Sequence, residues 1–459
     1  MLLDHGVNVD TENVQGETPL HLLSRGDFDT QQGVETARLL LEYGVDVNAR
    51  EKDGWISLHW AAFKGRVEVT QALLDHGANV KLETEEGETA LHTVSRGEYN
   101  SQEQGVSIAR LLLEHGVGVN TQEEEGWTSL HFAALRGRVE VAQVLLDHGA
   151  NAKLETKDSN TALHTVSRGE YNSQEQRASI AQLLLKSGID VNAREEDGWT
   201  SLHFAALRGR VEVAQVLLDH GANVKLETKD GETALHAVSR GENNFQEQRT
   251  STAQLLLECG ADVNAWEKDG WTSLHWAVFK GRVEIAQVLL DHGANAKLET
   301  KDGETALQLV SRGEYYDSEE HGVGIVRLLL EHGVDVHIQD KDFDTALHSA
   351  AFSGRLEITQ LLLGCGANPN MENEKGRTPL HQVSRGKYKS QEYGVGIAQL
   401  LLEHGVDVDA RAKNSDTPLH FAAFYGKLEI VQVRPFVLKK MDLYSGILGA
   451  SRSRCRPKC

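Results

Sequence analysis

The sequence predicts an all-α solenoid in which short helix pairs stack along the chain, and two observations lead to this prediction. The stretch 126–151, GWTSLHFAALRGRVEVAQVLLDHGAN, recurs letter for letter at 198–223. Its Thr-Ser-Leu-His tetrad returns, with small changes, along nearly the whole chain. Repetition at a fixed period of about 20 to 50 residues is typical of arrays whose units bury their apolar faces against one another.

The last residue of the tetrad sets the register of the repeats. This position occurs in twelve units, at His21, His59, His92, His131, His164, His203, His236, His275, Gln308, His348, His381 and His420. The spacing alternates between 33 residues, as from His59 to His92, and 39 residues, as from His92 to His131. The repeating unit is therefore a pair of repeats spanning 72 residues, which indicates tandem duplication of two repeats together.

Each short unit predicts two helices. Thr128 and Ser129 are small polar residues that favour a helix start, and the apolar run that follows ends at Gly137. A second helix is expected from about Val139 to the residue before Gly149, a glycine suited to the left-handed conformation that ends helices. This second helix is apolar around most of its circumference, which favours burial between neighbours.

Each long unit has six extra residues between its helices, in the segment SRGEYNSQEQ at 95–104 and its copies. Insertions in solenoids map to loops on one edge, so every second repeat is expected to raise a polar loop there. Three departures from the repeat, namely Gln308 at the histidine position and Ser159 and Phe343 at glycine positions, are expected to loosen single units.

These residues resemble the ankyrin repeat, whose signature is Thr-Pro-Leu-His-x-Ala, and most closely the long tandem arrays expanded in fungi. The resemblance implies an ankyrin-type α-solenoid of helix-turn-helix plus hairpin repeats, with alternating 33- and about 39-residue units. We expect an array at 1–433, with about twelve units plus a partial N-terminal one. A basic, disordered non-repeat tail is expected at 434–459, where seven Lys or Arg face one Asp. We interpret the tail as the result of a reading frame or splice prediction that leaves the repeat at Arg434, rather than as a targeting or docking segment.

Composition excludes several classes of function. The formal net charge of −21 argues against nucleic acid as a ligand, because phosphate binding needs clustered Lys and Arg. No stretch approaches the roughly 18 apolar residues of a membrane span, and no secretory signal begins the chain. The four cysteines predict no disulfide framework, because Cys259 and Cys365 stand singly in equivalent repeat positions and Cys455 and Cys459 lie in the tail. We expect an intracellular, cytoplasmic protein, with the nucleus as the alternative, and a monomeric array.

Catalytic, metal and cofactor signals are absent from the sequence. There is no phosphate-binding glycine loop, no Gly-x-Ser-x-Gly elbow and no His-Glu-x-x-His pair. Nearly all of the 21 histidines occupy repeat positions, either in the tetrad or just before the glycine that ends the second helix. The resemblance implies a structural role for the tetrad histidines. We therefore expect no enzyme activity, no metal and no cofactor.

The candidate binding residues lie at positions that the resemblance places on a concave face. A hairpin-tip series consists of Trp55, Trp127, Trp199 and Trp271. A first-helix series consists of Phe63, Leu135, Leu207 and Phe279, with Arg136 and Arg208 directly after two of them. Aromatic residues and Arg anchor many protein interfaces. The alternative is that duplication copied the tryptophans passively and that they pack within the array.

A second set of basic and aromatic residues recurs in the long units. Arginines of the Ser-Arg-Gly turns stand at Arg25, Arg96, Arg168, Arg240, Arg312 and Arg385. Tyrosines follow at Tyr99, Tyr171, Tyr315 and Tyr388. We interpret them first as a copied turn motif and second as a ladder of basic and aromatic residues.

The predicted function is a protein–protein interaction scaffold that binds partner proteins of unknown identity through the concave face of hairpins and first helices. The competing hypothesis is that the chain is the recognition or sensor portion of a larger multidomain signalling protein. An NTPase-type receptor or a ubiquitin-ligase adaptor would be examples of such a protein.

Overall fold

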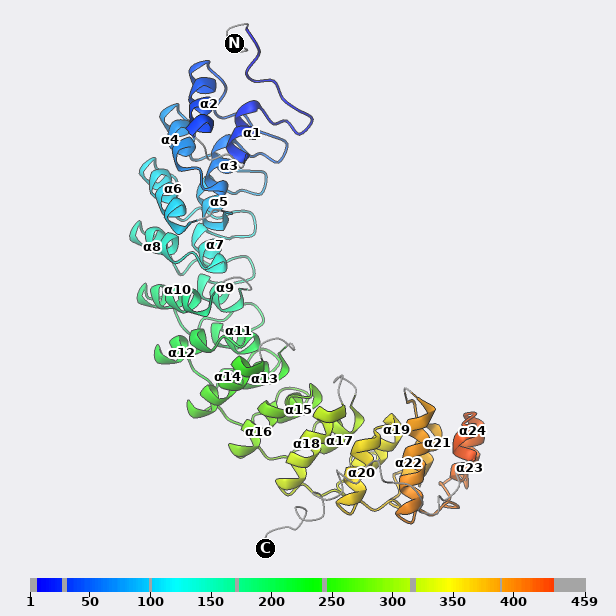
Figure 1. Cartoon of the computed structure of the whole chain (residues 1–459). Helices are drawn as coiled ribbons and strands as arrows, with labels where there is room; N and C mark the ends of the chain where they lie inside the picture. The colour runs from blue at the N-terminus through cyan, green and yellow to red at the C-terminus, as the bar shows by residue number, and fades with distance from the viewer. Residues whose placement is uncertain are drawn as a thin grey trace. The chain divides into compact units, whose positions relative to one another are not determined.

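The computed structural model describes residues 6–26, 31–98, 101–169, 173–241, 246–313, 319–388 and 390–432. The chain divides into two compact units, Met1–Lys229 and Asp230–Cys459. Within the described residues both units consist of helix pairs joined by extended hairpin segments, with only isolated β-bridges and no strand (Figure 1). The predicted all-α solenoid of ankyrin type is confirmed.

In each pair, the odd-numbered helix is the inner helix and the even-numbered helix is the outer helix. The helices of the first unit are α1 Pro19–Arg25, α2 Gln31–Glu42, α3 Ser57–Lys64, α4 Val67–Asp75, α5 Ala90–Arg96, α6 Gln102–Glu114, α7 Ser129–Arg136, α8 Val139–Asp147, α9 Ala162–Arg168, α10 Gln174–Lys186, α11 Ser201–Arg208 and α12 Val211–Asp219. Those of the second unit are α13 Ala234–Arg240, α14 Gln246–Glu258, α15 Ser273–Phe279, α16 Val283–Asp291, α17 Ala306–Arg312, α18 Glu319–Glu331, α19 Ala346–Ser353, α20 Leu356–Gly364, α21 Pro379–Arg385, α22 Gln391–Glu403, α23 Pro418–Phe424 and α24 Leu428–Val431.

The ends of the helices follow from the repeat sequence. Thr128 caps α7, and its side chain accepts a hydrogen bond from the backbone N–H of His131. Gly137 ends α7 with φ of 65°, and Gly149 follows α8 with φ of 86°. Both glycines adopt the left-handed conformation that a side chain disfavours, which explains why glycine stands there.

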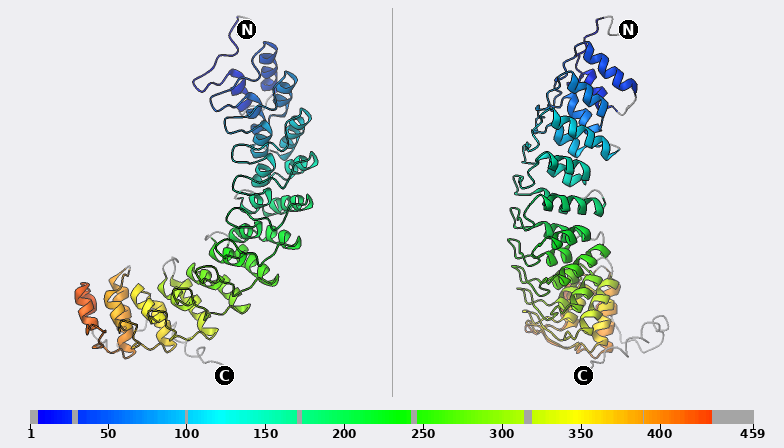
Figure 2. Two further views of the ribbon diagram at one scale, coloured as in Figure 1. Left: turned by 180° about the vertical axis from the view of Figure 1, so that it is seen from behind. Right: turned by 90° about the vertical axis from the view of Figure 1, so that its left-hand side faces the viewer.

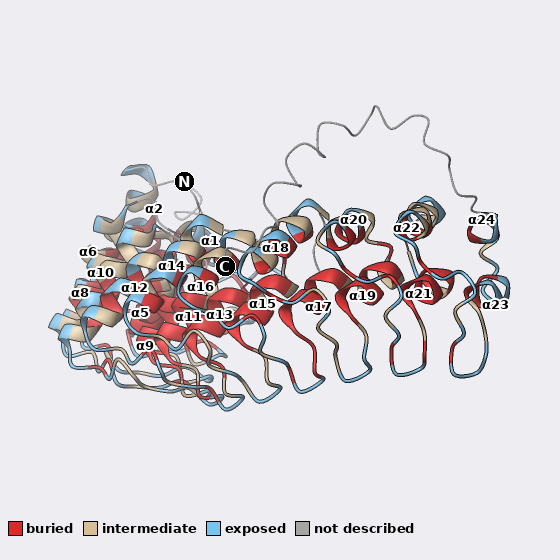
Figure 3. Cartoon of the chain, turned by 90° about the horizontal axis from the view of Figure 1, so that it is seen from below, coloured by how far each residue is buried: buried red, intermediate tan, exposed pale blue. Residues whose placement is uncertain are grey.

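The inner helices form the buried layer of each unit. Leu130, Ala133 and Ala134 of α7 are buried against α5 and α9, while Val141 and Leu145 of α8 complete the core from the outer layer. Figure 3 shows the same arrangement in the second unit, where α17, α19 and α21 form a buried row between exposed hairpins and the outer helices. The core is therefore continuous from repeat to repeat within each unit, as expected for a solenoid.

The hairpins project to one side of the inner helices in each unit (Figure 2). Successive hairpins are joined by backbone hydrogen bonds such as Glu124 N–H to the Glu86 carbonyl and Lys157 N–H to the Glu125 carbonyl, both 2.9 Å. At the other end of each hairpin, Asn120 Oδ1 accepts from the Asn151 N–H at 2.7 Å. The hairpin edge is thus a hydrogen-bonded row that holds its side chains at regular intervals.

The insertion in the long units differs from the expectation of a simple loop. The outer helix α6 has 13 residues, compared with nine in α8. The additional residues form its first turn, because Ser101 caps the helix and accepts from the Gln104 N–H. Gln and Glu are good helix formers, so most of the polar insertion lengthens the outer helix.

In three short repeats an arginine reaches back to the preceding long repeat. Arg138 donates to the carbonyl of Gly97 at 2.6 Å, and Arg210 donates to that of Gly169 at 3.1 Å. Arg282 makes the same contact with Gly241 in the second unit. These glycines follow the C-termini of inner helices, so the arginines satisfy carbonyls that the helix itself leaves without a partner.

Some predicted features lie outside the described residues. They are the tail at 434–459 and the loop tyrosines Tyr99, Tyr171 and Tyr315. Within the described part of the chain, no helix is both long enough and apolar enough to cross a membrane.

Candidate functional site

The hairpin tryptophans lie half-buried against the inner helix of their own repeat. The ring of Trp127 lies 5.2 Å from that of Phe132 and 5.9 Å from that of His131, measured between centroids. Trp199 repeats this geometry with Phe204, again at 5.2 Å. Each indole is therefore held in place by α7 or α11 while part of its surface stays accessible.

In two other repeats a third ring joins the cluster. Trp55 lies 4.5 Å from Trp60 and 5.9 Å from Phe63. In the second unit Trp271 lies 4.6 Å from Trp276 and 5.0 Å from Phe279. The structure thus brings the two predicted aromatic series together in these repeats.

The other first-helix candidates are also half-buried. They are Leu135 and Leu207, in the position of Phe63, and Arg136 and Arg208, which follow them. Where Lys takes the place of these arginines, its ammonium lies near the preceding ring, as with Lys64 at 5.7 Å from the centroid of Phe63. The predicted residues therefore lie on one face of hairpin tips and inner helices within each unit.

Sequence reasoning missed the ring that contacts each tryptophan most closely. These rings belong to Trp60, Phe132, Phe204 and Trp276, each directly after the tetrad histidine. Their recurrence every 72 residues, five positions after the hairpin tryptophan, was the available signal. We call each hairpin tryptophan and its partner ring an aromatic cluster.

The arginines of the Ser-Arg-Gly turns lie over the aromatic clusters. Arg25 lies 5.4 Å from the ring centroid of Trp60, Arg168 lies 4.4 Å from that of Phe204, and Arg240 lies 5.7 Å from that of Trp276. A guanidinium within about 6 Å of a ring centroid is attracted by the negative face of the ring. These rings are not the loop tyrosines of the predicted ladder, three of which lie outside the described residues, so that ladder stays a prediction.

Some of the turn arginines form ion pairs with buried glutamates at the hairpin positions that alternate with the tryptophans, namely Arg25, Arg96, Arg240 and Arg312. Arg96 lies 2.9 Å from Glu88, whose side chain is only 3% exposed. Arg240 lies 2.5 Å from Glu232. Burial raises the pKa of both carboxyl groups, and the neighbouring guanidinium opposes that shift. Arg25, Arg96 and Arg240 are thereby held between a carboxylate and a ring, whereas the hairpin position that corresponds to Arg168 holds Asn160.

The tetrad histidines have a structural role. His131 Nδ1 accepts from the Thr128 N–H at 3.2 Å, so the proton of the neutral ring is on Nε2, which donates to the Asn160 carbonyl at 3.1 Å. Burial lowers the pKa of His131 to about 4. The six tetrad histidines whose pKa falls to about 4 are His59, His92, His131, His164, His236 and His275.

The histidines that end the outer helices also face their own backbone. His76 and His148 each donate from Nδ1 to the carbonyl four residues earlier, at 2.8 Å. Among the residues that the structure describes, no group of three or more His, Cys, Asp or Glu side chains is placed to hold a metal ion.

Comparison with known proteins agrees with this architecture. The family model for ankyrin repeats, in three-copy segments, matches overlapping stretches that run from residue 29 to residue 433. The chain belongs to the ankyrin repeat family.

Individual relatives of this ankyrin array match only short segments. A putative ankyrin repeat protein of Rickettsia felis is 31% identical over 68 residues, which is 15% of this chain and 30% of the relative. Protein phosphatase 1 regulatory subunit 27 of Homo sapiens is 38% identical over 71 residues, 16% of this chain and 42% of the relative. Cyclin-dependent kinase 4 inhibitor B of Rattus norvegicus is 34% identical over 86 residues, 18% of this chain and 61% of the relative. The matches thus span less than two thirds of the length of each relative.

Ankyrin repeats generally mediate protein–protein interaction, and the two mammalian relatives are by name a phosphatase regulatory subunit and a kinase inhibitor. The family and these relatives favour a non-enzymatic role for the ankyrin array.

Proposed function

We propose that this ankyrin array is a scaffold that binds partner proteins through the face formed by its hairpin tips and inner helices, without catalysis of its own. The observation that supports this most strongly is the alternation of aromatic clusters with Arg–Glu ion pairs along that face. Trp and Arg are enriched among the residues that contribute most to binding energy, and a side chain that is already ordered but still accessible loses little entropy when a partner covers it.

The aromatic clusters meet both conditions. The indole of Trp127 is fixed by Phe132 and His131, so binding costs little side-chain entropy. The guanidinium of Arg168 is fixed over Phe204. A partner that covers these rings would bury apolar surface and meet a charge that the array already holds in position.

The test is affinity capture with the full chain as bait, comparing the wild type with Trp127→Ala/Trp199→Ala. The variant is expected to lose at least about tenfold in affinity for captured partners, because two ordered rings leave the face. Surface plasmon resonance with a recovered partner measures the change. Unchanged affinity would contradict the proposal.

A matched control separates binding from folding. Glu140 and Glu212 are exposed on the outer helices of the same two repeats, so Glu140→Ala/Glu212→Ala should leave capture unchanged. Circular dichroism and thermal melting of both variants check the fold. If the tryptophan variant lost helix content along with binding, Trp127→Phe/Trp199→Phe would retain rings for the packing and still reduce the contact with a partner.

A further inference from the structure

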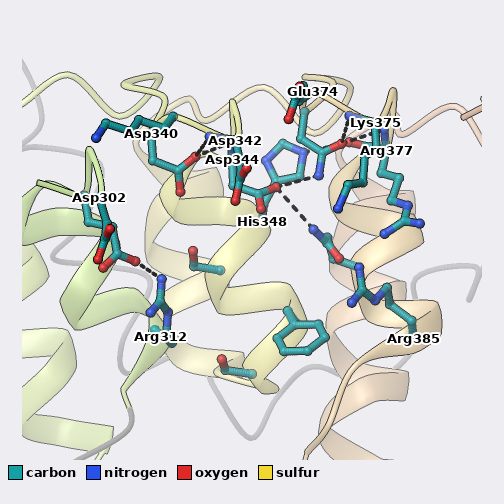
Figure 4. Close-up of a pocket in the computed structure, with 17 residues that line it drawn as sticks. Asp302, Arg312, Asp340, Asp342, Asp344, His348, Glu374, Lys375, Arg377 and Arg385 are labelled. Atoms are coloured by element: carbon teal, nitrogen blue, oxygen red, sulfur yellow. Dashed lines mark hydrogen bonds and ion pairs between the residues drawn. The ribbon is translucent and has the colours of Figure 1, made fainter. Parts of the chain in front are cut away.

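One short repeat of the second unit has no ring at either position of the aromatic cluster, whereas the last short repeat lacks the tryptophan, with Asp416 in its place, but keeps a ring at Phe421. At the hairpin position of Trp271 the first of these two repeats has Asp344, and at the position of Trp276 it has Ser349. A pocket of about 690 Å³ lies at this place, between α17, α19, α21 and their hairpins (Figure 4). The pocket therefore opens where the chain supplies rings in its other short repeats.

The walls of the pocket are held by hydrogen bonds and ion pairs. Asp344 Oδ1 accepts from Asn373 Nδ2 at 2.9 Å and from Gln382 Nε2 at 3.2 Å. Arg312 forms an ion pair with Glu304 on the opposite side. Because these groups are fixed by one another, the pocket is already formed without a ligand, as small binding sites usually are.

The surroundings of the missing ring are retained. In the repeat before, within the same unit, Arg240 lies 5.7 Å from the centroid of Trp276 and Phe279 lies 6.0 Å from it. Arg312 and Phe352 are the corresponding residues around Ser349, and both line the pocket. An arginine and a phenylalanine thus remain where they would contact a ring.

A carboxylate is retained at the position of the residue that accepts from an indole N–H in the first unit, and its Oδ1 also accepts from the backbone N–H groups of Asp342 and Asp344. In the first unit Trp60 Nε1 donates to Glu51 Oε1 at 3.2 Å. Asp340 occupies the position of Glu51, four residues before the hairpin ring, and it lines the pocket. The place left by Ser349 therefore has a cation, a ring edge and a carboxylate around it.

We propose that this pocket takes a tryptophan side chain of a partner protein, which stands where the chain's own ring stands in the other short repeats. The proposal rests on the proposed function and names a side chain that the face would recognise. A neutral ring suits the mixed charge of the walls. A Lys or Arg side chain would meet Arg312, Arg377 and Arg385, and a carboxylate would meet Asp340 and Asp344.

The test uses the full chain and N-acetyl-5-fluorotryptophanamide as the probe, followed by fluorine NMR. Saturable line broadening is expected with the wild type. Ser349→Trp restores the residue of the neighbouring repeat and fills the pocket, so it should weaken binding of the probe at least about tenfold. Gln360→Trp, which places a Trp on the exposed surface of the outer helix α20 in the same repeat, should leave probe binding unchanged.

Three results would overturn the proposal. They are the absence of saturable binding to the wild type, equal binding by folded Ser349→Trp, and more effective displacement of the probe by N-acetylargininamide than by N-acetyltryptophanamide. Circular dichroism establishes that Ser349→Trp is folded, and Asp340→Asn, which leaves the pocket open, gives an independent check through an expected smaller loss.

Binding measurements with a partner protein recovered by affinity capture test this proposal and the proposed function separately. Loss of that partner by Trp127→Ala/Trp199→Ala, with full retention by Ser349→Trp, would support the binding face and overturn the pocket for that partner. Retention by both variants would overturn both proposals.

Discussion

His131 and Asn160 are joined across a repeat boundary, with the imidazole Nε2 donating to the Asn160 carbonyl at 3.1 Å. The other ring nitrogen accepts from Thr128 at the start of the inner helix. One side chain therefore fixes a helix start and the next hairpin together. Gln308 makes the same set of contacts, with Oε1 accepting from the Thr305 N–H at 2.7 Å and Nε2 donating to the Asp344 carbonyl at 2.9 Å.

This equivalence predicts that His131→Gln retains most of the stability that His131→Ala loses. Alanine would leave buried backbone groups without partners, at a cost of about 1–3 kcal/mol. Glutamine supplies both an acceptor and a donor. Urea denaturation followed by circular dichroism measures the difference, and equal destabilisation by the two variants would show that the ring itself is required. The retained contacts also show that Gln308 keeps the hydrogen bonds of its unit, while the loosening expected from the sequence stays a prediction.

The tetrad histidines predict a loss of stability in mild acid. In the folded protein their pKa of about 4 lies below the ordinary histidine value of 6.5. Between pH 4 and pH 6.5 the unfolded chain therefore binds more protons than the folded protein. Stability is then fully present above about pH 6.5 and falls as the pH drops toward 4. Burial, with Glu232 nearby, raises the pKa of Glu267 to about 7, which acts in the opposite sense. The raised pKa values of Glu51, Glu88, Glu232, Glu319 and Asp340 act in that sense as well, and we expect the six histidines with a pKa of about 4 to outweigh them.

The measurement for this prediction is the melting temperature as a function of pH. We expect a lower melting temperature at pH 5 than at pH 7, with a smaller difference in His131→Gln, which removes one titrating ring. A melting temperature that is constant or rises between pH 7 and pH 5 would argue against neutral buried histidines.

The pair of Arg96 and Glu88 predicts a specific stability loss. Arg96→Ala would leave the 3% exposed Glu88 carboxylate without its counter-ion, and we expect a loss of about 1–3 kcal/mol. Lys157→Ala is the control, because Lys157 pairs with Glu125 at 3.3 Å where both side chains are more than 60% exposed, so its loss should stay below about 0.5 kcal/mol. The double variant Arg96→Ala/Glu88→Gln should recover part of the loss, as measured by denaturant titration.

Ser159 predicts a gain of stability on substitution. It occupies the hairpin glycine position with φ of 60°, and Phe343 does so with φ of 59°. Ser159→Gly should stabilise the array by about 0.5–1 kcal/mol, because glycine adopts this conformation without steric cost. Ser201→Gly, a change within α11, should instead destabilise it. Thermal melting of the two variants tests the contrast.

The repeat register and the helix positions could be predicted from the sequence because every unit carries its own start and stop residues. The hairpin tryptophans could also be placed on the face of hairpin tips and inner helices within each unit. Their partner rings were missed because Trp127 and Phe132 lie on two different elements, a hairpin and a helix, whose angle the sequence does not state. The extended outer helices were missed because polar residues such as Gln102 favour both a helix start and a loop.

The reach of Arg138 to the Gly97 carbonyl has a consequence for how the array can change in length. The donor belongs to a short repeat and the acceptor to the long repeat before it, so the bond crosses a junction between two kinds of unit. Removing 72 residues regenerates the same junction, whereas removing one repeat brings two like units together and leaves a donor or an acceptor without its counterpart. We therefore expect recombination in this gene to add or remove repeats two at a time. The array can then change in length without changing whether its number of repeats is even or odd.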